Sequence, residues 1–350
     1  MLVSLLTLFS YFMDINNLYY YDNAIPIMSN RLFITGIVML ASFVVSMLLL
    51  KRGSTGQGKE QLPVRIFKIL IIAFAYIVPL LELNIQLEYY TDNYGVSSFR
   101  YVALAVFTVI YIAILSIIYC KKIPSKGYIF GLLYATVCLY AGFYSILITN
   151  LRYDMFYLSY GGTYLPVHFA IHLLSLPAIA YIIYLIVKNI KSYPESSTVL
   201  SWFLTILVVV ILSIETDNIV VWMLTNAYNY YEILYDVHTF GYPILWGIIA
   251  MILMIWGLNR KEALLRQISL VFFGLIIVKF YAYDVWKMSQ TGRIISFVLL
   301  GVILLLVSFL QQKIRTLVRN DDKPEAVSGR PDNIPVVTDD NNEQQLTDDV

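Results

Sequence analysis

The chain has 350 residues, of which 59% are hydrophobic and 13% are charged, and its mean hydropathy is +0.72. A soluble domain carries about a quarter charged residues, so this composition excludes an ordinary soluble protein. The net charge of +1 is spread over short loops, and we expect no nucleic-acid partner. Two isolated cysteines, Cys120 and Cys138, indicate neither a disulfide framework nor a zinc knuckle.

Apolar runs long enough to cross a hydrocarbon layer of about 30 Å recur along the chain, and each needs about 20 residues as a helix. Residues 1–13 form a shorter run without a signal-peptide pattern, and we interpret it as a short or truncated first span. The sequence therefore predicts an all-α, polytopic membrane bundle of about ten helices. The nine longer spans are predicted at 32–50, 65–85, 100–119, 127–148, 166–187, 198–223, 240–258, 264–284 and 291–311.

Basic residues alternate between successive loops. One set of loops holds sixteen Lys and Arg, whereas the intervening loops hold five. Because Lys and Arg are retained on the cytoplasmic side, this alternation predicts that both termini are cytoplasmic and that the protein is a multi-pass protein of the bacterial cytoplasmic membrane. The basic set comprises residues 51–68, 121–126, 188–197, 258–266 and 311–319.

The composition changes after Arg319. Residues 320–350 are rich in Asp, Asn and Pro and contain no aromatic residue. We interpret residues 1–319 as the membrane bundle and 320–350 as a disordered, acidic cytoplasmic tail. The tail is either a solvated terminus or a docking peptide for a partner.

Four ionisable residues fall within different predicted spans: Glu82, His172, Glu215 and Lys279. A helical rise of 1.5 Å per residue places each of them about 20–24 Å from the cytoplasmic end of its span. Charged groups at membrane depth are costly and indicate function. These positions predict a polar site in the outer third of the bilayer.

The charge of Lys279 needs a partner from another span, because Asp284 lies about 140° away around the same helix. Glu215 and Glu82 lie at matching depth, so Lys279, Glu215 and Glu82 are the predicted intramembrane charge cluster. The alternative is that Lys279 extends to the outer headgroups among the aromatic residues of 281–286.

The three histidines, His168, His172 and His238, all fall on the predicted outer side. His168 and His172 are four residues apart and share a helical face, so they are candidate zinc ligands with His238 as a third. Histidines of an aromatic-rich interface are more often hydrogen-bonded, and we expect no cofactor. The tyrosine-rich outer loops fit either an interfacial belt or a stacking surface for a saccharide.

The last third of the chain resembles the C-terminal part of the predicted membrane protein family known as domain of unknown function 2339. The resemblance implies a bacterial polytopic membrane protein, usually with a longer N-terminal part, and implies no particular activity. It also implies that Lys279, Asp284 and Arg293 form one element, with Asp284 and Arg293 paired across an outer hairpin. The residues that carry it are Trp246, Gly257, Arg266, Lys279 to Asp284, Arg293, Ser296, Phe297, Gly301 and the SFLQQK stretch.

No phosphate-binding loop and no nucleophile elbow occurs, so the sequence does not support an ATP-driven pump or a serine hydrolase. We expect a carrier or cell-envelope assembly component that handles an extracytoplasmic small molecule, saccharide or lipid-linked ligand. An enzymatic function is less favoured; that alternative is a membrane-embedded metal enzyme with an outward-facing histidine site. A structural scaffold is the third alternative.

Overall fold

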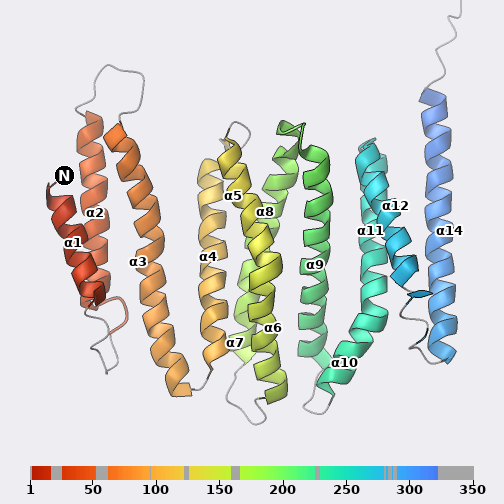
Figure 1. The fold of residues 1–350 in the computed structure, drawn as a ribbon, viewed down its shortest axis with the longest axis horizontal. Coiled ribbons are helices and arrows are strands. Elements are labelled where there is room, and N and C mark those ends of the chain that lie inside the picture. Colours follow the sequence, from red (N-terminus) through yellow and green to blue (C-terminus); the bar gives the residue numbers. More distant parts are fainter. Residues whose placement is uncertain are drawn as a thin grey trace, which may run out of the picture. The chain divides into compact units, whose positions relative to one another are not determined.

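The computed structural model describes most of the chain, and every element in the described part is helical (Figure 1). The described residues are 2–16, 26–52, 62–94, 96–121, 126–158, 166–224, 229–279, 281–282, 286 and 290–321. Helices are the form expected for an apolar chain in a bilayer, because they satisfy every backbone hydrogen bond within the segment.

Several of the long continuous helical segments, here called rods, combine α-helix with short π or 3-10 turns. The fourth and fifth long rods each contain such turns, and so does the rod formed by α10, η7 and α11. In chain order the elements are α1 (Leu2–Asn16), α2 (Arg31–Arg52), α3 (Leu62–Tyr94), α4 (Ser97–Tyr119), α5 (Gly127–Leu139), η3 (Tyr140–Tyr144), α6 (Ser145–Tyr153), η4 (Asp154–Leu158), α7 (Pro166–Ala170), η5 (Ile171–Leu174), α8 (Ser175–Asn189), η6 (Ile190–Ser192), α9 (Ser197–Leu224), α10 (Tyr230–Asp236), η7 (Val237–Gly241), α11 (Tyr242–Asn259), α12 (Ala263–Lys279) and α14 (Gln290–Asp321).

Seven rods in the described part of the chain are long and apolar enough to cross a membrane. A shorter apolar helix covers Val3–Ile15, where the short first span was predicted. The seven match seven of the nine longer predicted spans, and consecutive rods of this part run antiparallel (Figure 1). The seven rods are Arg31–Arg52, Leu62–Thr91, Ser97–Tyr119, Gly127–Tyr157, Pro166–Ser192, Ser197–Leu224 and Tyr230–Asn259.

The chain divides into two compact units, Met1–Trp286 and Lys287–Val350. The second unit contains α14, which continues through Asp321 and thus runs just past the predicted start of the tail. Residues 322–350, the rest of the predicted disordered tail, lie outside the described residues. Asp284 also lies outside them, so the predicted pairing of Asp284 with Arg293 stays a prediction.

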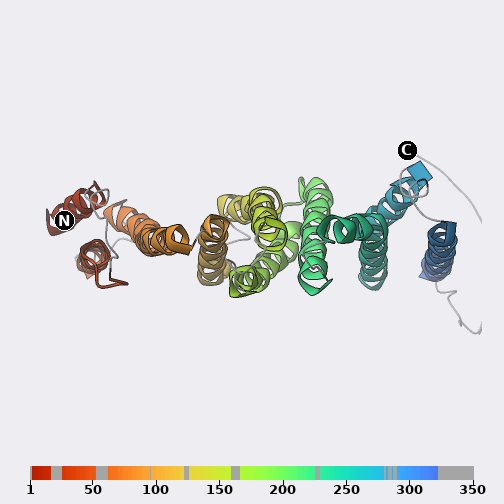
Figure 2. The same cartoon turned by 90° about the horizontal axis from the view of Figure 1, so that it is seen from below.

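Two apolar clusters hold the first unit together. The larger cluster contains residues from the successive helices α4 through α9. These helices lie close to one another when seen end-on (Figure 2). The smaller one joins α1, α2 and α3 around Tyr11, Met39 and Phe74. Gly36 of α2 allows α3 to approach closely, because a Cβ atom there would lie 2.7 Å from a methyl group of Val78. Small residues at helix contacts are the usual means of close packing between spanning helices.

Candidate functional site

Three polar residues of α9 are buried near the end of the helix that lies opposite the basic loops. Glu215, Asp217 and Asn218 are all less than a tenth exposed. Asn218 lies about one helical turn after Glu215, whereas Asp217 points about 100° away from Asn218. Glu215 and Asp217 therefore point towards different neighbours of α9, and Asn218 lies between these two directions.

Arg152 of α6 supplies the positive charge of this site. Its guanidinium Nη1 donates a hydrogen bond of 2.9 Å to Asn218 Oδ1 and lies 3.6 Å from Asp217 Oδ2. Arg152 is only 4% exposed, as is Asp217. A buried arginine and a buried carboxylate at this separation neutralise each other, which offsets part of the cost of removing both from water.

Asp217 is also held from the rod that contains η7 and α11. Tyr242 donates its hydroxyl hydrogen to Asp217 Oδ2 over 3.0 Å, and His238 Nε2 lies 3.1 Å from the same oxygen. The ring of Tyr242 stacks on Trp246, whose indole Nε1 donates to Ser213 Oγ of α9. These contacts connect α9 to α11 through polar groups at a depth where such groups are rare.

Glu215 faces His172 on the opposite side of α9. Glu215 Oε2 lies 3.5 Å from His172 Nε2 and accepts a hydrogen bond of 3.3 Å from Asn218. The other ring nitrogen, Nδ1, contacts the carbonyl oxygen of Phe169. Because a carbonyl oxygen only accepts, Nδ1 carries the hydrogen of this contact. His172 Nε2 is buried and has no hydrogen-bond partner among the described residues.

The polar cluster, defined as Arg152, His172, Glu215, Asp217, Asn218, His238 and Tyr242, is not saturated by its own hydrogen bonds. Among the described residues of the cluster, Arg152 Nε, His172 Nε2 and Asp217 Oδ1 have no hydrogen-bond partner although all three atoms are buried. Buried polar atoms are nearly always satisfied, by protein, by water or by a ligand. A guanidinium donor, an imidazole nitrogen and a carboxylate acceptor in the same cluster are thus left for another molecule.

Lys279 lies beside this cluster, at the end of α12. Its ammonium group donates a hydrogen bond of 3.1 Å to the carbonyl oxygen of His238 and lies 5.5 Å from the ring centroid of Trp246. Both contacts come from the rod that contains η7 and α11. Lys279 contacts His238, and His238 in turn contacts Asp217.

Glu82 makes its hydrogen bonds elsewhere in the unit. Its carboxylate accepts from the backbone N–H of Met28, from Asn30 and from Gln86, at 2.9, 2.6 and 3.0 Å. These contacts fasten the segment before α2 to α3. Of the three predicted cluster residues, the structure thus places Glu215 within the polar cluster, Lys279 at its edge and Glu82 in the contact between α2 and α3.

The histidines have separate partners. His168 Nε2 lies 2.9 Å from the Tyr90 hydroxyl, whereas His172 and His238 each face a carboxylate of α9. Among the described residues, no group of three His, Cys, Asp or Glu side chains is arranged to hold a metal ion. The zinc alternative stays a prediction.

The sequence interpretation named neither Arg152 nor Asp217 as a site residue. Arg152 was assigned to an outer loop because the predicted span ended at residue 148, but the helix continues through Leu158. The longer rod includes the π-helical segments η3 and η4. The available signal was that Arg152 is one of only five basic residues in the weakly basic set of loops.

The geometry defines a multi-pass membrane protein that buries an ion network between its helices. A family model described as predicted membrane protein (DUF2339) matches residues 1–314, and the chain belongs to this family. No curated protein and no solved structure matches the chain. The resemblance that was seen in the last third therefore extends through nearly all of the membrane part.

Proposed function

We propose that the protein is a carrier or cell-envelope assembly component and that the polar cluster is its ligand site. The observation that carries this proposal is the pair of buried, unsatisfied atoms, Arg152 Nε and Asp217 Oδ1. A buried donor and a buried acceptor on facing helices suit a small polar or zwitterionic group, such as part of a saccharide or the polar part of a lipid-linked molecule.

The site opens to the extracytoplasmic side in this proposal. We place ten spans in the bacterial cytoplasmic membrane, with both termini cytoplasmic, by adding α1, α12 and α14 to the seven long rods. The unequal distribution of basic residues supports this orientation, because it leaves the polar cluster at the ends with few Lys and Arg. A ligand would then reach the cluster from outside or from the outer leaflet.

Asn218 connects the two carboxylates of the cluster, because it contacts both Arg152 and Glu215. A charged ligand group at Asp217 would therefore change the electrostatic environment of Glu215. Such a site needs no nucleotide, in agreement with the absence of a phosphate-binding loop.

The proposal is tested by thermal unfolding of the purified protein with a defined set of probes: neutral sugars, amino acids and a short-chain lipid-linked disaccharide. A ligand of the folded state raises the unfolding temperature in proportion to its affinity. We expect one probe class to stabilise the protein, and His238→Gln to abolish that stabilisation. Lys188→Gln, on the basic side, is the matched control and keeps it.

Two results would point elsewhere. Equal stabilisation of the His238→Gln variant would place the ligand outside the polar cluster. If no probe stabilises the protein while removal of residues 320–350 releases a bound partner, the scaffold alternative is favoured. For the metal-enzyme alternative, zinc that co-purifies and is lost on His172→Ala is the supporting result.

A further inference from the structure

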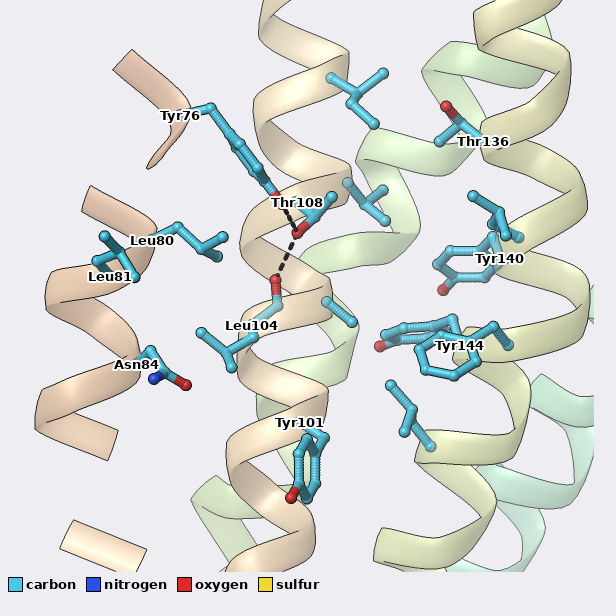
Figure 3. A pocket seen from close by; sticks show the side chains of 16 residues that line it. Tyr76, Leu80, Leu81, Asn84, Tyr101, Leu104, Thr108, Thr136, Tyr140 and Tyr144 are labelled. Carbon is cyan, nitrogen blue, oxygen red and sulfur yellow. Dashed lines mark hydrogen bonds between the residues drawn. The ribbon is translucent and has the colours of Figure 1, made fainter. Parts of the chain in front are cut away.

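A groove of about 400 Å³ lies between α3, α4 and the rod formed by α5, η3 and α6 (Figure 3). Its size falls within the range of about 300–1,000 Å³ that is usual for small-molecule sites. Most of its lining is apolar, with leucine, valine, isoleucine and aromatic side chains. The hydroxyl groups of Tyr76 and Thr108 are hydrogen-bonded to each other at 3.0 Å, so they leave the wall largely apolar.

The groove has an open mouth and a closed floor. Tyr101, Leu139 and Phe143 line it and are 55, 65 and 62% exposed, so they mark the mouth. Tyr140 and Tyr144 also line it and are buried. Figure 3 shows these two rings one above the other on the wall that faces Leu104. Since the mouth residues belong to membrane-spanning rods, the groove opens towards lipid.

The depth of the groove matches the outer half of the bilayer. Counted from Lys126 at the basic end of α5, Thr136 lies about 15 Å and Leu147 about 31 Å along the helix. Both residues line the groove. With a hydrocarbon core of about 30 Å, the groove therefore runs from the middle of the membrane to its outer surface. The molecules available at this depth are the hydrocarbon chains of outer-leaflet lipids.

The guanidinium of Arg100, which is ion-paired with Glu88, lies at the outer end of the groove. Arg100 donates two hydrogen bonds, of 3.1 and 3.0 Å, to the side-chain oxygen of Asn84, which lines the groove. Arg100 also contacts Glu88 at 3.1 Å, but the carboxylate of Glu88 is half exposed to the surroundings. An arginine in this position presents a planar, multiple donor of the kind that binds phosphate oxygens.

We propose that this groove binds one acyl chain of an anionic phospholipid of the outer leaflet, with the lipid phosphate at Arg100. The inference rests on the proposed function for its orientation, and it adds a second ligand next to the polar cluster. The apolar walls suit the chain, and the guanidinium suits the charged headgroup. A narrow groove with a cation at its interfacial end fits a single lipid better than a flat protein surface.

The floor of the groove also connects the lipid to the polar cluster. Tyr140 is hydrogen-bonded to Ser175 Oγ at 2.8 Å, and Ser175 Oγ in turn donates to the carbonyl oxygen of His172 at 2.6 Å. His172 faces Glu215. A lipid chain that rests against Tyr140 therefore supports the helix turn that positions His172 opposite Glu215.

The test is native mass spectrometry of the purified full chain with added phosphatidylglycerol and, in parallel, phosphatidylcholine with the same acyl chains. We expect wild-type protein to retain one phosphatidylglycerol preferentially. Ala105→Phe fills the groove and should lower its occupancy at least tenfold, whereas Ile114→Phe, on the opposite face of α4, should not. Arg100→Gln should remove the preference for the anionic headgroup, with Lys188→Gln as its control.

A second measurement uses unmodified protein. Phosphatidylglycerol with a photoactivatable chain should crosslink to peptides that contain residues 101–112 and 136–147. Crosslinks that avoid both peptides, or equal lipid retention in Ala105→Phe and Ile114→Phe, would overturn the proposal. A co-purifying isoprenoid phosphate displaced by Ala105→Phe would overturn the phospholipid assignment. His238→Gln should keep the lipid, so failure of the groove and failure of the polar cluster are distinguished.

Discussion

Arg152 of α6 and Asp217 of α9 face each other between two spanning rods, with the guanidinium Nη1 3.6 Å from the carboxylate Oδ2 and both side chains nearly inaccessible. The two residues belong to the first unit and are each held by a further polar group, Asn218 and Tyr242. This pair is the electrostatic centre of the proposed ligand site.

Replacing Arg152 by Met should destabilise the protein by about 3–5 kcal/mol, because Asp217 would keep a buried charge without its partner. The double variant Arg152→Met, Asp217→Leu should recover part of this loss, since it removes both charges. Reversible unfolding in mixed detergent micelles measures the free energy. Arg260→Met, at an exposed position of the basic side, is the control and should change it little. A loss as small as that of the control would show that the pair does not hold α6 to α9.

The carboxylate of Glu82 should be needed for the attachment of the segment before α2. Glu82→Gln keeps the size of the side chain but turns an amide donor towards groups that are themselves donors: the Met28 N–H and the Asn30 amide. We expect a destabilisation of about 1–3 kcal/mol. Limited proteolysis should also cut sooner near residue 30. Glu195→Gln, at an exposed position, serves as the control.

The contact between α2 and α3 should be sensitive to a single methyl group. In Gly36→Ala the new Cβ would lie 2.7 Å from a methyl carbon of Val78, which forces the two helices apart. Overpacking of this kind costs about 1–3 kcal/mol. Gly131→Ala in α5 is a matched control, because its Cβ meets no described atom within 4 Å. If both variants unfold at the same temperature, the close approach of α2 and α3 is not important for stability.

The sequence predicted the helical fold well because hydropathy and helix length alone determine where a chain can cross a membrane. It was weaker at the ends of the helices. The span predicted to end at residue 148 continues through Leu158. Polar residues near the membrane surface, such as Arg152, fit either a loop or a helix end.

The candidate site was predicted only in part, because depth along a helix says nothing about which helices are neighbours. Glu82 and Glu215 lie at similar depth, yet Glu82 bonds to Asn30 and Glu215 faces His172. The direction in which each residue of α9 points could be calculated from the sequence, but the partner on the facing helix could not. Packing of the rods was needed to bring Arg152 to Asp217.

The most direct measurement is labelling of a cysteine at position 238 in intact cells with a membrane-impermeant maleimide, after replacement of Cys120 and Cys138. His238 contacts Asp217, and its side chain is half exposed, so a cysteine there reports on access to the polar cluster. The proposed orientation predicts labelling in intact cells, whereas Ser192→Cys in η6 should react only after the cells are opened. Protection of position 238 in intact cells, together with labelling of position 192, would contradict an extracytoplasmic ligand site.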